Sequence, residues 1–83
     1  MKKMSREAFI LGQRREELNM TQKQIAAEIG ISLQQYQRFE YGYRDVSAAS
    51  AKLVLRICAA LELDPYELIF ENGIDLAGKD TQE

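Results

Sequence analysis

The sequence predicts an all-α protein of five short helices. Apolar residues recur at helical spacing along most of the chain, and no alternating run is long enough for a strand. Residues that favour helix ends punctuate this pattern at short intervals. The chain has 83 residues, of which 46% are hydrophobic, so it has room for one domain with one modest core.

The first expected helix ends near Asn19, a residue type that tolerates the left-handed conformation common after helix ends. Ala8, Leu11 and Leu18 form an apolar stripe along this helix. Arg15 lies on the same stripe. Because an arginine should not be buried alone, Arg15 is expected to have a partner.

The next two expected helices are short and closely spaced. Thr21 begins a capping box, and the helix that follows ends at Gly30. Ser32 begins a second capping box and a third helix, which stops near Gly42. Two capped helices with so short a connection form a tight helical turn. The side chains expected between them are Ile25, Ala26, Ile29, Ile31, Tyr36 and Phe39.

Residues 44–49 are expected to form a loop, and a fourth helix begins at Ser47 or Ser50. Asp64 and Pro65 then favour a new helix start, which predicts a fifth helix to about residue 71. The chain is polar from residue 72 onward, so we expect one domain over 1–71 and a tail over 72–83. The inward residues expected of the fourth helix are Ala51, Val54, Cys58 and Leu61.

The composition argues against an enzyme. The chain has no histidine, and its single cysteine, Cys58, is expected to be a small buried residue. No glycine-rich phosphate loop is present, so no metal or cofactor is expected. No apolar run is long enough to cross a membrane, and the start Met1-Lys2-Lys3 lacks the apolar stretch of a secretion signal. These features predict a cytoplasmic protein.

The formal net charge of −2 hides an asymmetry between the two halves of the chain. Residues 1–44 hold eight lysines and arginines against five acidic residues, and residues 45–83 hold three against eight. A protein that presents one face to phosphates would show such a difference.

Residues 22–41 resemble a helix-turn-helix of the lambda-repressor/Cro (XRE-like) type, and the stretch from about 5 to 70 resembles that five-helix family. The resemblance implies a five-helix lambda-repressor-like domain that binds duplex DNA. The connection after Gly42 is about three residues longer than is usual in the family. The residues that carry the resemblance are Thr21, Gln22, Ile25, Ala26, Gly30, Ile31, Ser32, Arg38, Phe39, Glu40, Gly42, Leu61, Leu63, Asp64, Glu67 and Leu68.

The third helix is the expected recognition helix. If Tyr36 and Phe39 are buried, the opposite face presents polar side chains and Arg38 to the major groove. Glutamine can bond an adenine edge, arginine a guanine edge, and an aliphatic side chain suits the thymine methyl group. By resemblance, the base-reading positions are Leu33, Gln34, Gln37 and Arg38.

The resemblance also implies two further sets of residues. Gln22 matches the position that bonds phosphate and supports the recognition helix, while Arg15 matches an arginine that pairs with the glutamate ending that helix, here Glu40. A buried ion pair is a structural role rather than a DNA contact. The expected phosphate contacts are Gln22, Lys23, Gln35, Tyr41, Tyr43 and Arg44.

One domain of this size covers only a few base pairs, so we expect a homodimer on a two-fold site. Three functions remain open: a transcriptional regulator, an antitoxin that binds DNA and a toxin, and a protein-binding module that does not read DNA. The last two would have a protein partner, a toxin or an anti-regulator. The expected dimer surface comprises Tyr66, Ile69, Phe70, Ile74 and Leu76.

Overall fold

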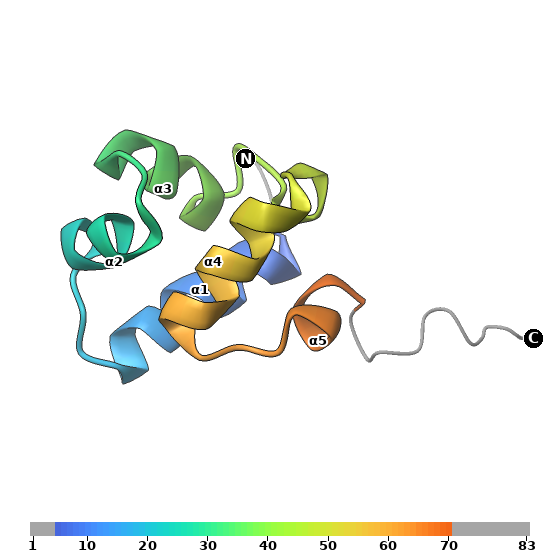
Figure 1. Ribbon diagram of the computed structural model, residues 1–83. Coiled ribbons are helices and arrows are strands. Elements are labelled where there is room, and N and C mark those ends of the chain that lie inside the picture. Colours follow the sequence, from blue (N-terminus) through green and yellow to red (C-terminus); the bar gives the residue numbers. More distant parts are fainter. Residues whose placement is uncertain (1–4, 71–83) are drawn as a thin grey trace, which may run out of the picture.

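The computed structural model describes residues 5–70, and this part of the chain is all-helical, as the sequence predicts. The helices α2 and α3 lie on one side of the crossing pair α1 and α4, and α5 lies on the other (Figure 1). The elements are α1 (Arg6–Glu17), α2 (Gln22–Ile29), α3 (Leu33–Glu40), the short 3-10 helix η1 (Val46–Ala48), α4 (Ala51–Leu61) and α5 (Pro65–Ile69).

Polar side chains cap the start of each α-helix. Thr21 and Ser32 form the two predicted capping boxes. Each hydroxyl accepts a hydrogen bond from the backbone N–H three residues later, and the glutamine side chain at that later position accepts one from the backbone N–H of the capping residue. Asp64 caps α5, and Ser50 rather than Ser47 caps α4. Such bonds satisfy backbone N–H groups that a helix start leaves without partners.

One apolar core joins all five α-helices. Its side chains include Leu11 of α1 and Leu68 of α5, which are 0% and 2% exposed. Cys58 is buried in it as predicted, and burial raises the pKa of its thiol. Ala51, which was expected to face inward, is instead exposed at the first turn of α4. Ile57, further along the same helix, is fully buried.

The connection from α3 to α4 differs from the predicted loop. Residues 46–48 form η1, whose Val46 is 1% exposed and belongs to the core. The fifth helix is also shorter than expected, because α5 ends at Ile69. Residues 1–4 and 71–83, and with them the predicted tail and the dimer residues Ile74 and Leu76, lie outside the described residues.

Three arginines of α1 bind backbone carbonyls of other segments. Arg6 donates to the carbonyls of Glu67 and Leu68 in α5, and Arg14 donates to that of Leu61 at the end of α4. Arg15 donates to the carbonyl of Met20 as well as to Glu40. Within residues 5–70, no helix has the length and apolar character needed to cross a membrane.

Candidate nucleic-acid interface

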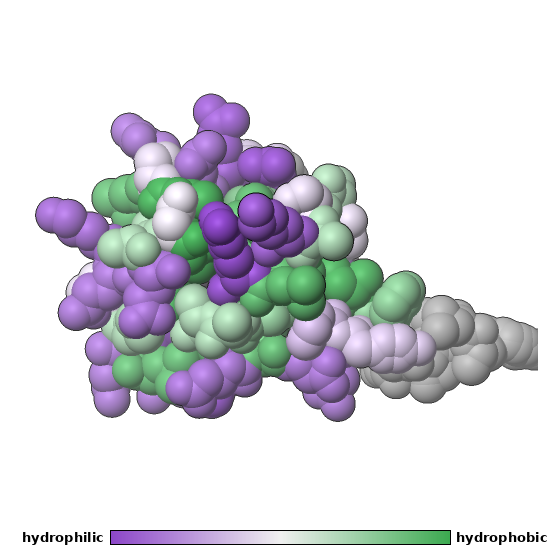
Figure 2. Space-filling model, in the orientation of Figure 1, coloured by the Kyte–Doolittle hydropathy of each residue, from purple (hydrophilic) through white to green (hydrophobic). Residues whose placement is uncertain are grey.

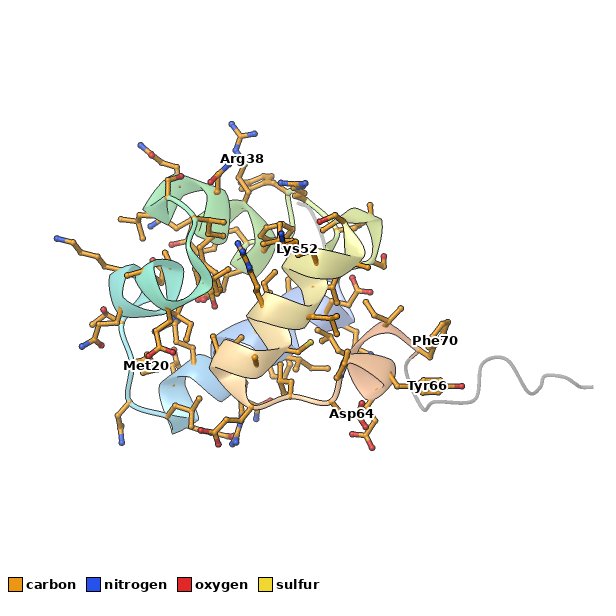
Figure 3. The ribbon with its side chains drawn as sticks, in the orientation of Figure 1. Met20, Arg38, Lys52, Asp64, Tyr66 and Phe70 are labelled. Carbon is orange, nitrogen blue, oxygen red and sulfur yellow. The ribbon has the colours of Figure 1, made fainter. Side chains whose placement is uncertain are left out.

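The third helix is oriented by its two aromatic residues. Tyr36 and Phe39 are 0% and 1% exposed, so the face that carries them is buried as predicted. Leu33, Gln34 and Arg38 are exposed on the rest of α3, and Figure 3 shows Arg38 pointing away from the body of the protein. The side chains that the sequence assigns to base reading are therefore accessible from outside, apart from the half-buried Gln37.

Gln37 is held by Gln22. Its Nε2 donates to Oε1 of Gln22 at 2.9 Å, which joins α3 to the start of α2. The Nε2 of Gln22 in turn donates to Oε2 of Glu40 at 3.1 Å and to the hydroxyl of Tyr41 at 3.1 Å. This network fixes the side chain of Gln37 before any ligand binds.

The charge state of Glu40 fixes how both amides are oriented. An ionised carboxylate can only accept, so the NH₂ group of Gln22 must face Glu40 and its oxygen must face Gln37. Gln37 therefore turns its own NH₂ group toward Gln22 and keeps its oxygen free to accept. One hydrogen on its Nε2 also remains, so the group can still make the two bonds that an adenine edge offers.

Arg15 and Glu40 form the ion pair that the resemblance implies. Two bonds join them, Nε to Oε1 at 2.9 Å and Nη2 to Oε2 at 2.8 Å, and the side chains are 14% and 9% exposed. Burial by itself raises the pKa of Glu40, but the interactions with Arg15, Tyr36 and Gln22 outweigh it, and the net pKa lies below its usual value. The carboxylate stays charged near neutral pH.

Two neighbours enclose this ion pair. Gly12 lies so close that an added Cβ would come within 3.2 Å of Oε2 of Glu40, so a side chain there would press on the carboxylate. The hydroxyl of Tyr36 is buried and has no hydrogen-bond partner within residues 5–70. Desolvation, followed by the direct interaction with the Glu40 carboxylate, raises the pKa of Tyr36, so this hydroxyl stays neutral.

The predicted phosphate contacts divide into two groups. Lys23 is exposed and forms no ion pair within residues 5–70, whereas Gln35 and Gln22 already use their side chains in hydrogen bonds inside the protein. Both hydrogens of the Gln22 amide are occupied, so its side chain has no N–H left to donate to a phosphate. The first backbone N–H groups of a helix have no intrahelical partner and attract anions.

The residues after Gly42 turn back over the end of α3. The backbone N–H groups of Tyr43 and Arg44 both donate to the carbonyl of Arg38, at 2.8 Å and 3.1 Å. The guanidinium of Arg44 lies 4.8 Å from the centre of the Phe39 ring, while the side chain of Tyr43 is 70% exposed. Arg44 thus covers a core aromatic and holds a positive charge at the end of α3.

The basic residues of the first half of the chain differ in how they are used. Arg6, Arg14 and Arg15 account for much of the basic excess of residues 1–44, but their guanidinium groups are bonded inside the protein. Besides Arg6, whose guanidinium binds backbone carbonyls, the exposed cations without an ion pair within residues 5–70 are Lys23, Arg38, Arg44, Lys52 and Arg56. Three of the eight basic residues of 1–44 therefore make contacts within the protein.

A comparison with models of protein families identifies the family of this chain. A sequence model of the helix-turn-helix family matches residues 11–68, which is more than half of the chain. The chain belongs to the Cro/C1-type helix-turn-helix family. The match begins inside α1 and ends inside α5, so it includes both helices of the motif and the core that supports them.

A solved structure has the same fold. The crystal structure of the clp gene regulator ClgR from C. glutamicum is similar with a TM-score of 0.65 over 88% of this chain and 91% of that chain. The sequences are 20% identical, so this likeness concerns the fold. No curated protein matches the sequence significantly.

Proposed function

We propose that this protein is a transcriptional regulator that binds double-stranded DNA with α3 in the major groove. One observation carries the proposal: with Tyr36 and Phe39 buried, α3 presents Gln34 and Arg38 exposed and Gln37 half-buried beside them. These side chains have the donors and acceptors that base edges recognise. Membership of a DNA-binding family supports this role over catalysis, and DNA binding implies the cytoplasm as the working compartment.

The side chains of α3 suit different bases. Arg38 is the candidate for guanine, Gln34 and Gln37 are candidates for adenine, and Leu33, which is 38% exposed, is suited to a thymine methyl group. Gln37 would lose less conformational entropy on binding DNA, because its bond to Gln22 already restricts its long side chain.

Phosphate contacts surround this base-reading face. We assign them to the N-terminus of α2 at Gln22 and Lys23, and to Tyr43 and Arg44 beyond the end of α3. Tyr41 is exposed at 46% and Gln35 keeps its Nε2 free, so both can add a bond to phosphate. These contacts position the helix without reading sequence.

We further propose a two-fold dimer through the α5 end of the molecule. Tyr66 and Phe70 are exposed there, while Ile69 packs partly against the core. Figure 2 shows apolar surface beside α5, whereas polar and apolar side chains are mixed on the part of the visible face over α2 and α3. Pairing two domains would double the DNA site, which one domain leaves too short for specific binding.

The test is binding of the purified full chain to a random duplex pool, followed by a salt titration on the selected sequence. We expect a two-fold sequence motif and an affinity that falls steeply as salt rises, because phosphate contacts release counterions. Absence of affinity for any duplex at low salt would contradict the proposal and favour a protein-binding module. A motif without two-fold symmetry would contradict the dimer alone.

A further inference from the structure

An open pocket of about 430 Å³ lies between α1 and the end of α3. This volume falls in the range of pockets that bind small organic molecules. The side chains that give the pocket its chemistry are two aromatic rings and two carboxylates, those of Phe9, Tyr41, Glu16 and Glu40. Among these four residues, only Tyr41 is a proposed DNA contact, so the pocket itself has no role in the proposed function.

The aromatic surface of the pocket comes from two separate elements. Phe9 of α1 is 58% exposed, and Tyr41, which caps the end of α3, is 46% exposed. Neither ring belongs to the apolar core. The face of an aromatic ring is partially negative, so an exposed ring attracts cations as well as apolar groups.

The two carboxylates make the pocket acidic. The side chain of Glu16 is 76% exposed, and Glu40 lies directly against Gly12, where an added Cβ would come within 3.2 Å of its Oε2. The missing side chain at Gly12 therefore lets the pocket extend to Glu40. Within residues 5–70, no lysine or arginine lines the pocket. Even with Arg15 paired to Glu40, two carboxylates and one guanidinium leave a net negative charge that repels phosphate.

We propose that this pocket binds a small organic cation, a substituted ammonium group. The apolar substituents of such a group would contact Phe9 and Tyr41, while its charge would face Glu16 and Glu40. A simple metal ion has no apolar part to contact the rings, and an anion would meet two carboxylates. The site does not depend on the proposed DNA binding, so each can fail without the other.

Tyr41 connects the pocket to side chains behind α3. Its hydroxyl accepts from Nε2 of Gln22 at 3.1 Å, and Oε1 of Gln22 accepts from Gln37. A ligand that contacts the ring of Tyr41 should therefore alter the surroundings of the Gln22 side-chain amide. This amide lies outside the pocket lining and provides a second reporter of binding.

The test is a titration of the isotope-labelled full chain with choline at constant ionic strength, followed by NMR. Its control probe is dimethylbutanol, an uncharged analogue that has carbon in place of the nitrogen. We expect choline to shift the backbone amides of Gly12 and Tyr41 and the side-chain amide of Gln22 along one saturating curve. The uncharged analogue should bind about tenfold more weakly, because it loses both the cation–π and the carboxylate attraction.

Two pairs of variants test the residues. Phe9→Leu removes the ring but keeps an apolar side chain, and Glu16→Gln removes one charge. Both side chains are exposed, so the variants should keep the fold, and each should weaken choline binding about threefold. The matched controls are Tyr66→Leu, an exposed aromatic on α5, and Glu17→Gln, the next carboxylate of α1. Neither control residue lines the pocket, so both variants should bind choline like the wild type.

Four results would overturn the inference. The first is the absence of a saturating shift at Gly12 and Tyr41, and the second is equal binding of choline and dimethylbutanol. The third is equal weakening in the control variants, which would indicate attraction by overall charge. The fourth is tighter choline binding when Lys2→Gln and Lys3→Gln are combined, which would mean that the chain's own lysines compete for the pocket.

Discussion

Glu40 connects the stability of the protein to the face proposed to bind DNA. Its two oxygens accept from Arg15, and one of them also accepts from Gln22, which in turn holds Gln37. A residue that is itself 7% exposed thus determines the orientation of Gln37, a side chain proposed to read a base. Changes at Glu40 should alter both folding and DNA recognition.

Replacing Arg15 should destabilise the fold strongly. Arg15→Met leaves the carboxylate of Glu40 buried without its main partner, and breaking a buried pair in this way costs about 3–5 kcal/mol. Urea unfolding measures the loss. Arg14→Met is the control, because the side chain of Arg14 is 30% exposed and its ion pairs with Glu17 and Glu62 are exposed, so we expect a loss of about 1 kcal/mol. Equal losses in the two variants would refute the special role of Arg15.

The lowered pKa of Glu40 predicts a pH dependence of stability. Because the folded-state pKa lies below the unfolded value, the charged carboxylate stabilises the protein above the unfolded pKa, which is about 4.3 for glutamate. That stabilisation is lost as the pH falls through the folded pKa. Glu40→Gln should therefore flatten the acid side of a plot of unfolding free energy against pH. Glu28→Gln, which removes an exposed carboxylate, is the control, and an unchanged acid slope in Glu40→Gln would contradict the assignment.

At the residue scale, the buried side chains were easier to predict from the sequence than the hydrogen bonds between helices. Burial of Tyr36 and Phe39 followed from helical spacing, and the partner of Arg15 followed from the family resemblance. The resemblance implied that Gln22 supports the third helix, but its partner Gln37 could not be predicted, because that bond depends on the distance between two helices rather than on spacing along one.

At the scale of elements, the helix starts were predictable because capping is local. Each capping box lies within four successive residues, so the sequence contains the whole interaction. The 3-10 helix η1 was missed because three residues with one buried side chain, Val46, give no periodic signal. The end of α5 was predicted too late, since the contact from Arg6 comes from a residue more than 60 positions away.

The turn between α2 and α3 depends on the backbone of Gly30, which has φ of +92° and ends α2. An added Cβ would meet only Nη1 of Arg56, at 3.8 Å, so the cost of Gly30→Ala is backbone strain rather than a clash. We expect a loss of about 1–2 kcal/mol in urea unfolding. Gly30→Asn should lose less, because asparagine tolerates this conformation. A Gly30→Ala variant as stable as the wild type would contradict this account.

At the scale of the whole molecule, the proposed DNA-reading and pairing surfaces lie at separate ends. Figure 3 shows Arg38 on one side of the molecule and Tyr66 with Phe70 on the other. Both surfaces depend on α1, because Arg15 supports the network behind α3 and Arg6 supports α5. The fold class was predictable from periodicity and capping, whereas this sharing of α1 appears only in three dimensions.

The most direct test of the account is the base preference of Arg38→Ala. Binding is measured against a panel in which each base pair of the selected site is varied in turn. An Arg38 that reads a base should lose discrimination at one position, costing about 1–3 kcal/mol on the preferred sequence, while preferences elsewhere stay unchanged. Equal weakening on every sequence would make Arg38 a phosphate contact, and unchanged binding would contradict the reading role assigned to the exposed face of α3.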